Sequence, residues 1–450
     1  MLDATQALTV LAELAPGPTP RALLDHRLAE IAGGLEHNPI FRPGELPDTH
    51  FMRFVIIDDP QGELPSVLAW ETNHDELAGD YLAEVARAAP SIEAVFACCV
   101  DYPAGGVADV DAWVAWMLAR AYPAGAFYTG YRGVPRRTVV NDRRVHDAIR
   151  EVVDREDRAA LRSLPRNEIR RRICEQVAAH HPELELSPTG DEEARWLIGK
   201  LVALLGTLVL LPILMVLALP WYLMLRRKET TDIASAYARP VDVDPAVRAA
   251  EDQVTQNQLT HLVDIKPGVF RLATLWIVLK AIDVAARVYS VRGDLGGITA
   301  IHFARWVIIP DRRDRPDRRD RRDQPDRSDR RDGHEPRPHG PRRHRLLFFS
   351  NYDGSWESYL GEFIDRAAFG LTAVWSNTRG FPATEHLVLA GARDEESFKQ
   401  WTREHQIATQ VWWTGVADST VQNIRDDIWI RRRLDCGLSD DEIATWLRKL

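Results

Sequence analysis

The chain has little cysteine and none of the common catalytic motifs. Its 450 residues include four cysteines, and only Cys98 and Cys99 are neighbours, so no zinc-ligand spacing and no disulfide framework is present. We predict no metal site. A net charge of -9 provides no basic field for phosphates, so no specific nucleic-acid partner is expected. An H-E-x-x-H helix, a phosphate-binding loop, a G-x-S-x-G elbow and a dinucleotide-binding glycine fingerprint are all missing. The chain therefore shows no established catalytic signature.

One pattern occurs twice in the chain. The string His50-Phe-Met-Arg-Phe-Val-Ile-Ile57 returns as His302-Phe-Ala-Arg-Trp-Val-Ile-Ile309, and Asn73-His-Asp75 returns as Asn351-Tyr-Asp353. Upstream, the spacing from His37 to the Pro-Gly pair ending at Gly44 equals the spacing from His261 to the pair ending at Gly268. Two copies on one chain favour an architecture built by pairing them within the molecule.

The second copy shows the order of elements most clearly. Its strand-like runs are Ile301–Ile309, Leu346–Asn351, Leu371–Ser376, Leu387–Ala390 and Gln410–Thr414. Helical runs separate them, in the order typical of ferredoxin-like units with one extra strand in front. We therefore predict an α+β fold in which two tandem ferredoxin-like units pair as a pseudo-dimeric α+β barrel, with a membrane-embedded helical segment between them.

The predicted membrane segment is an uncharged run of 25 residues, LVALLGTLVLLPILMVLALPWYLML, from Leu201 to Leu225. As a helix it would exceed the thickness of the hydrocarbon core, which is about 30 Å. Pro212 lies at its middle, so a single span and a re-entrant hairpin both remain open. A span would separate the two copies, so we favour membrane attachment with both copies in the cytoplasm. The N-terminal residues show no basic region typical of a secretory signal, which agrees with this.

These features divide the chain into three parts. We expect a first ferredoxin-like repeat over 1–190, a membrane segment over 191–228 and a second repeat over 229–450. Two additions fall in the second repeat. One is an amphipathic helix over 269–289, which would cover the bilayer surface or the domain core. The other is an Arg/Asp-rich segment over 311–345, whose charge and prolines predict disorder.

Arg53 and Arg305 are the sharpest candidate site residues, because each lies in the middle of an apolar strand. A buried guanidinium must be paired or hydrogen-bonded. One interpretation is an internal ion pair with Glu84 or Glu362. The other is that the arginines face the space between the sheets and bind a carboxylate or phosphate.

The remaining candidates are histidines and polar residues near strand ends. His50 and His302 begin the strands that hold the two arginines. They would share a site with them only if a bulge intervenes or if the histidine lies at a frayed strand end. Asp75 and Asp353 stand where helices begin, which is typical of N-caps and also of polar groups at a pocket mouth. The tentative site therefore contains His302, Arg305 and Asp353, with His50, Arg53 and Asp75 as first-copy counterparts. Asn351 and His261 are tentative cofactor contacts.

The layout resembles the dimeric α+β barrel superfamily, which includes dye-decolorizing peroxidases, chlorite dismutases and antibiotic-biosynthesis monooxygenases. The string Ser350-Asn-Tyr-Asp353-Gly354 is similar to the G-x-x-D-G pattern of dye-decolorizing peroxidases but lacks its first glycine. The resemblance implies haem as a cofactor, with His261 as a candidate ligand. It also implies an oxidoreductase, of peroxidase or monooxygenase type, that acts on an apolar or anionic small molecule.

Two other hypotheses stand beside this one. The chain is either a non-catalytic module that binds a lipid or another small molecule at the bilayer, or a structural membrane protein without a ligand. A filled interface between the two sheets would favour the structural hypothesis.

Overall fold

The computed structural model describes residues 5–59, 62, 64–156, 163–186, 192–232, 242–252, 255–288, 298–311, 343–434 and 437–450. The first repeat contains β1 (Gln6–Glu13), α1 (Pro18–Ala32), β2 (Thr49–Ile57), β3 (Val67–His74), α2 (Ala78–Ala88), α3 (Glu93–Phe96), α4 (Val110–Ala119), β4 (Ala126–Thr129), α5 (Arg136–Arg155) and α7 (Arg166–His180). Helices α8 (Glu192–Glu229) and α9 (Pro245–Ala249) follow. The second repeat contains β5 (Gln256–Asp264), α10 (Val269–Val288), β6 (Ile301–Ile309), β7 (Arg345–Asp353), α11 (Trp356–Trp375), β8 (Thr384–Glu385), β9 (Leu389–Ala390), α12 (Glu395–His405), β10 (Val411–Thr414), α13 (Val421–Arg431) and α14 (Asp440–Arg448).

The two repeats exchange their last strands. One four-stranded sheet has the order β1-β3-β2-β10, and the other has the order β4-β6-β7-β5. Strand β10 of the second repeat thus pairs with β2 of the first, with Trp412 opposite Arg53. Strand β4 of the first repeat pairs with β6 of the second, with Phe127 opposite Arg305. Each sheet is antiparallel and incomplete without the other repeat.

The segment that precedes each exchanged strand is hydrogen-bonded to its own repeat. Tyr122 donates its N–H to the Thr9 carbonyl at 2.8 Å, and four residues later the chain enters β4. In the same way, Ile407 donates to the Thr260 carbonyl at 3.0 Å before the chain enters β10. The two segments therefore connect the edges of the two four-stranded sheets.

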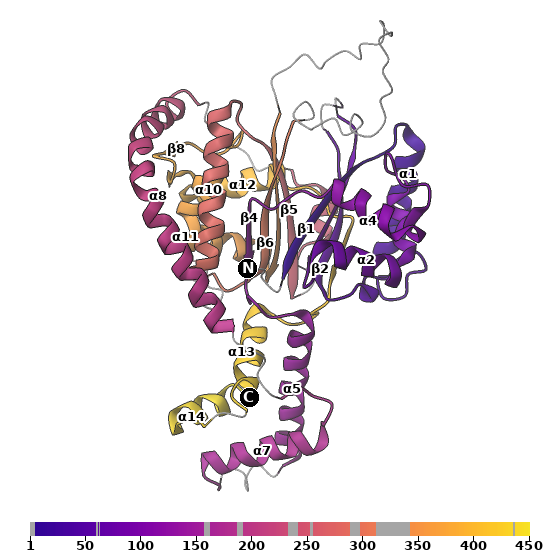
Figure 1. The fold of residues 1–450 in the computed structure, drawn as a ribbon, viewed down its shortest axis with the longest axis vertical. Helices are drawn as coiled ribbons and strands as arrows, with labels where there is room; N and C mark the ends of the chain where they lie inside the picture. Colours follow the sequence, from indigo (N-terminus) through magenta and orange to yellow (C-terminus); the bar gives the residue numbers. More distant parts are fainter. Residues whose placement is uncertain are drawn as a thin grey trace, which may run out of the picture.

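The sheets divide the molecule into layers. Helices α1, α2 and α4 cover the outer face of one sheet, and α8, α10, α11 and α12 lie on the opposite flank (Figure 1). Met52 and Phe54 of β2 are buried under the first group of helices. Val55 alternates with them and packs between the sheets against Val307 and Leu347 of the other repeat. Helices α5, α7, α13 and α14 extend away from the sheets as a projection, which we call the stalk (Figure 1).

The strand register and the turns that follow the strands show which residues of the two repeats are equivalent. Gly17 (φ 105°) and Gly268 (φ 106°) hold the same left-handed turn after β1 and β5, directly before α1 and α10. Glycine is favoured there because it has no Cβ. Helix α10 is therefore the counterpart of α1, and the position equivalent to His261 is Val10 rather than His37, because Val10 and His261 make matching bridges to Ala121 and Gln406.

One predicted strand is helical in the structure. The segment Leu371–Ser376 was expected as a strand, but 371–375 form the end of α11. Its counterpart near Phe96 is also helical, as α3. A short apolar run does not distinguish a buried strand from a buried helix by its periodicity.

The prediction of a membrane-embedded segment and a transmembrane helix is wrong. Among the described residues, no helix combines the length and the apolar character needed to cross a membrane. The apolar run belongs to α8, which continues through Pro212 and Pro220 and lies alongside α10 (Figure 1). Trp221 donates its indole N–H to Thr274 of α10 at 3.1 Å, and Leu225 is buried with Ala373. Part of the apolar surface therefore covers the second repeat. Most of the Arg/Asp-rich segment, 312–342, lies outside the described residues.

Candidate functional site

A single carboxylate connects the two repeats between the sheets. Glu71 of β3 accepts a hydrogen bond from Arg53 Nε at 2.8 Å, and its other oxygen lies 2.7 Å from Arg305 Nη2. The side chains of all three residues are at most 1% exposed. The interpretation of an internal ion pair is confirmed, but the partner is Glu71 rather than Glu84 or Glu362. Glu71 is the cross-strand neighbour of Arg53 on β3.

The remaining donors of Arg53 and the Nη donors of Arg305 are also satisfied within the protein. Arg53 Nη1 donates to Gln258, Thr260 and the Leu259 carbonyl, while Nη2 donates to the Ser350 carbonyl and to Asn351 Oδ1 at 2.6 Å. Arg305 donates to the carbonyls of Leu8 and Thr72, each at 2.7 Å, and to Thr9. These contacts use the arginines as links between the repeats and leave no guanidinium N–H of Arg53 for a ligand.

The buried network has a cationic excess, since two arginines share one glutamate. Burial lowers the pKa of Arg305 to about 10, and the Glu71 carboxylate offsets part of this effect. Burial likewise lowers the pKa of Arg53. Arg305 stays charged at neutral pH. The rings of Phe349 and Phe127 lie 5.1 and 5.6 Å from the guanidinium carbons of Arg53 and Arg305, which adds favourable contact with the ring faces.

The two histidines that begin these strands form a matched pair of His–Asp contacts. A bulge occurs at each histidine, between Thr49 and Phe51 in β2 and between Ile301 and Phe303 in β6. His50 Nε2 lies 2.8 Å from Asp75 Oδ1, and His302 Nε2 lies 2.8 Å from Asp353 Oδ1. The bulge turns both imidazoles toward the end of the intersheet space.

The aspartates do not cap the helices that follow them in sequence. Asp75 Oδ2 accepts the N–H of Arg136, the first residue of α5, at 2.6 Å. Asp353 Oδ2 accepts the N–H of Val421, the first residue of α13, at 2.7 Å. Ser355 provides the cap of α11 instead. A carboxylate at a helix N-terminus is stabilising, so each His–Asp pair joins a sheet to one helix of the stalk.

Aromatic rings fill the space around the two histidines. His50 lies 5.3 Å from Phe303, His302 lies 5.1 Å from Phe51, and Tyr131 lies within 5.8 Å of both imidazoles, measured between ring centres. A haem would need an open face beside a histidine nitrogen. Here Nε2 of each histidine is engaged by an aspartate and the adjacent ring faces are packed. The residues between the sheets therefore do not fit a haem.

His261 lies apart from the other candidates, on the outer face of β5. Its ring centre is 4.9 Å from Trp375, 4.6 Å from Trp401 and 5.6 Å from His405. The side chains predicted as one site thus separate into two places. Arg53, Arg305, Asn351 and the His–Asp pairs lie between the sheets, and His261 lies in the second helical core. Within the described residues, no group of three or more His, Cys, Asp or Glu side chains is arranged around a common metal position.

The stalk holds a second buried polar cluster, which the sequence did not reveal. Asp142 of α5 pairs with Arg431 of α13, and Asp427 of α13 pairs with His146 of α5 at 2.5 Å. The two pairs are crossed, since Asp142 and Asp427 lie at equivalent positions, as do His146 and Arg431. Burial raises the pKa of Asp142 to about 6, and Arg431 offsets part of the rise.

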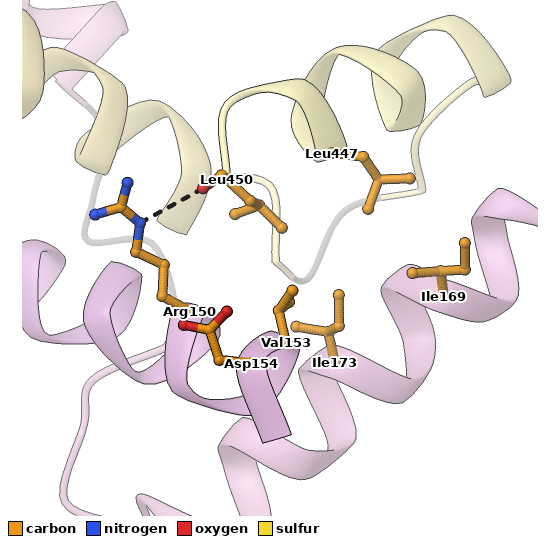
Figure 2. Close-up of a pocket in the computed structure, with 7 residues that line it drawn as sticks. All are labelled: Arg150, Val153, Asp154, Ile169, Ile173, Leu447 and Leu450. Atoms are coloured by element: carbon orange, nitrogen blue, oxygen red, sulfur yellow. Dashed lines mark hydrogen bonds between the residues drawn. The ribbon is translucent and has the colours of Figure 1, made fainter. Parts of the chain in front are cut away.

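A pocket of about 480 Å³ opens at the far end of the stalk (Figure 2). Its lining is mostly aliphatic, with Arg150 and Asp154 on one side. Arg150 Nε donates to the Leu450 carbonyl oxygen at 3.5 Å (Figure 2). The other lining residues are Val153, Ile169, Ile173, Leu447 and Leu450. The described residues of its lining include no histidine and no hydroxyl or thiol side chain, so most of this surface offers apolar contact.

Sequence reasoning missed Glu71, the residue that organises the intersheet network. One signal was present, because a glutamate inside the apolar run of β3 requires a partner. The repeat comparison hid it, since the equivalent residue of β7 is Phe349. In comparisons with known proteins, no family model, curated protein or solved structure matches the chain.

Proposed function

We propose that the protein is a non-catalytic scaffold in which two fused repeats rigidly hold a helical stalk for contact with a partner protein. The observation that supports this function best is the filled interior. Glu71, Arg53 and Arg305 satisfy one another at the place where a barrel of this kind would hold a ligand. An anion would have to displace Glu71 or the backbone carbonyls that the guanidinium groups contact, and a displaced buried group is costly.

The connection between the sheets and the stalk supports the same function. Each sheet contributes an aspartate to the first turn of a stalk helix, and the crossed pairs then join α5 to α13. Polar contacts of fixed geometry specify a single arrangement of the elements they join. A scaffold requires this rigidity, whereas an oxidoreductase also requires an accessible reacting group. The histidines between the sheets are enclosed, and each is paired with an aspartate through Nε2.

The interior is tested with Arg305→Met and Arg53→Met in the full-length chain. We expect native mass spectrometry of the wild type to give the mass of the bare chain, and haemin to produce no protein-bound Soret band. Both substitutions should lower the unfolding midpoint without removing any bound molecule, while Arg87→Met on the exposed side of α2 should leave the midpoint unchanged. A small molecule that co-purifies with the wild type and is lost in Arg305→Met would overturn the proposal.

The stalk is tested by photocrosslinking in cells that express the protein. A photoreactive residue in place of Ile169, at the pocket, should crosslink to one discrete protein, and the same residue in place of Arg87 should not. Adding Leu447→Asp in the pocket should remove the crosslink. The partner-binding part of the proposal is wrong if the pocket position gives no discrete product, or if the product survives Leu447→Asp.

A further inference from the structure

Two histidines meet at the edge of the second helical core. His261 comes from β5, and His405 ends α12. The next two residues pair with β5, because Gln406 forms a bridge with His261 and Ile407 donates its N–H to the Thr260 carbonyl at 3.0 Å. This register holds the two imidazoles side by side, with ring centres 5.6 Å apart and planes inclined by 39°.

Both imidazoles have a nitrogen available as a ligand. His405 Nδ1 faces the Trp401 carbonyl oxygen at 2.9 Å. A carbonyl only accepts, so Nδ1 carries the proton and Nε2 keeps its lone pair. In His261, which is 1% exposed, neither ring nitrogen has a hydrogen-bond partner among the described residues. Buried polar atoms without a partner are uncommon and point to a missing water or ion.

Burial favours the neutral form of both rings, which is the form that binds a metal. It lowers the pKa of His261 well below its usual value, and the neighbouring His405 lowers it further. Burial is also the largest influence on His405 and lowers its pKa. The carboxylates of Glu404 and Asp264 act in the opposite direction on His405 and supply negative potential at the site.

We propose that His261 and His405 together bind one divalent late transition-metal ion, Zn²⁺ or Cu²⁺, with water as the remaining ligands. Imidazole nitrogen is a preferred ligand of both ions. Metal–nitrogen distances of about 2.0–2.1 Å with a tetrahedral angle place two imidazole centres about 5–6 Å apart, which agrees with the observed separation. The His405 side chain is 20% exposed, so water reaches the site from that side.

The repeat comparison supports a function for His261 beyond packing. The equivalent position in the first repeat is Val10, which is fully buried in the corresponding core. A hydrophobic residue therefore satisfies the fold at this place, and a histidine with two unpaired nitrogens costs stability unless something binds them. The surrounding Trp375 and Trp401 supply apolar walls and compete with no ligand nitrogen.

The site is tested by adding Cu²⁺ or Zn²⁺ alone to the purified full-length chain. We expect one Cu²⁺ to bind with nitrogen hyperfine structure from two imidazoles in the electron paramagnetic resonance spectrum. Zn²⁺ should bind in calorimetry and raise the unfolding temperature. His261→Val copies the first repeat, so it should fold yet bind either ion at least about tenfold more weakly. His405→Gln should weaken binding similarly.

The matched control is the double variant His180→Gln/His181→Gln, which removes two adjacent histidines from the stalk. This control should bind both ions as the wild type does. The proposal is overturned if the wild type binds no equivalent of either ion at millimolar concentration. It is also overturned if His261→Val and His405→Gln, with unfolding curves that show a folded state, retain wild-type affinity, or if the control loses the binding.

Discussion

Glu71 and Phe349 occupy the same register position in the two repeats, opposite Arg53 and Arg305 respectively. The arginine is present twice and its carboxylate once. Glu71 therefore reaches across the intersheet space to Arg305 as well as to Arg53 on the neighbouring strand. This asymmetry makes the pairing of the repeats specific, because a pair of identical second repeats would bury two arginines without an acid.

Removing the shared carboxylate should be strongly destabilising. Glu71→Gln would leave two buried guanidinium groups without a counter-charge, and breaking such an interaction costs about 3–5 kcal/mol. Glu84→Gln on α2 is the control, since Glu84 contacts neither arginine, and should change stability by no more than about 0.5 kcal/mol. Urea unfolding at pH 7 measures both free energies. Equal effects of the two variants would show that the shared ion pair does not hold the repeats together.

His74 should make the protein sensitive to acid. The imidazole is buried and stacks on the ring of Tyr81, with 3.9 Å between the ring centres. Burial is the main reason why its pKa is lowered from 6.5 to about 3. The unfolded chain takes up a proton at this residue below pH 6.5 and the folded chain does not until about pH 3. Stability is therefore lost as the pH falls through this window.

The second repeat supplies the variant that tests this prediction. Tyr352 stands at the position of His74 and stacks on Tyr359 at 4.0 Å. His74→Tyr should therefore fold. Between pH 7 and pH 4.5, the loss in free energy of unfolding should be about 2–3 kcal/mol smaller in the variant than in the wild type. Urea unfolding at both pH values gives the comparison. Identical losses in the two proteins would contradict the prediction.

Asp142 should have the opposite effect to His74 and make the protein more stable as the pH falls. Its folded pKa of about 6 exceeds the usual 3.8 because the carboxyl is buried. The folded chain thus holds this proton over a window where the unfolded chain has lost it, and stability falls as the pH rises through about 4 to 6. Asp142→Asn removes this contribution. Relative to the variant, the wild type should gain up to about 3 kcal/mol between pH 7 and pH 4. The prediction is refuted if the difference in free energy of unfolding between the wild type and Asp142→Asn stays constant with pH.

The parts of the fold that local pattern encodes were predictable from the sequence. Strands β2, β3, β6 and β7 carry the duplicated strings, and the arginines at the centres of β2 and β6 were identified as buried. The exchange of β4 and β10 was not predictable, because both strands are short and their partners lie far away in sequence. Pairing between distant segments leaves no periodic trace in either one.

The burial of the two candidate arginines was predictable, but the partners of the candidate residues were not. A bulge at His50 and His302 was one of two predicted alternatives and is present in both strands. Asp75 and Asp353, however, were assigned to the helices that follow them. Their real partners, Arg136 and Val421, begin helices of the stalk. The apolar run of α8 was misread for a related reason. Its composition matches a membrane segment, while its packing on α10 depends on residues far away in the chain.

The reciprocal variants Asp353→Asn and Asp75→Asn test the connection between the sheets and the stalk. Loss of the charge weakens the contact with the histidine and with the first turn of one stalk helix, at a cost of about 1–2 kcal/mol. Hydrogen exchange should quicken at the start of α13 in Asp353→Asn and at the start of α5 in Asp75→Asn, so each variant is the control for the other. The assignment fails if both variants speed exchange at the same helix or at neither. A helix-specific response would show that each His–Asp pair fixes its own arm of the stalk.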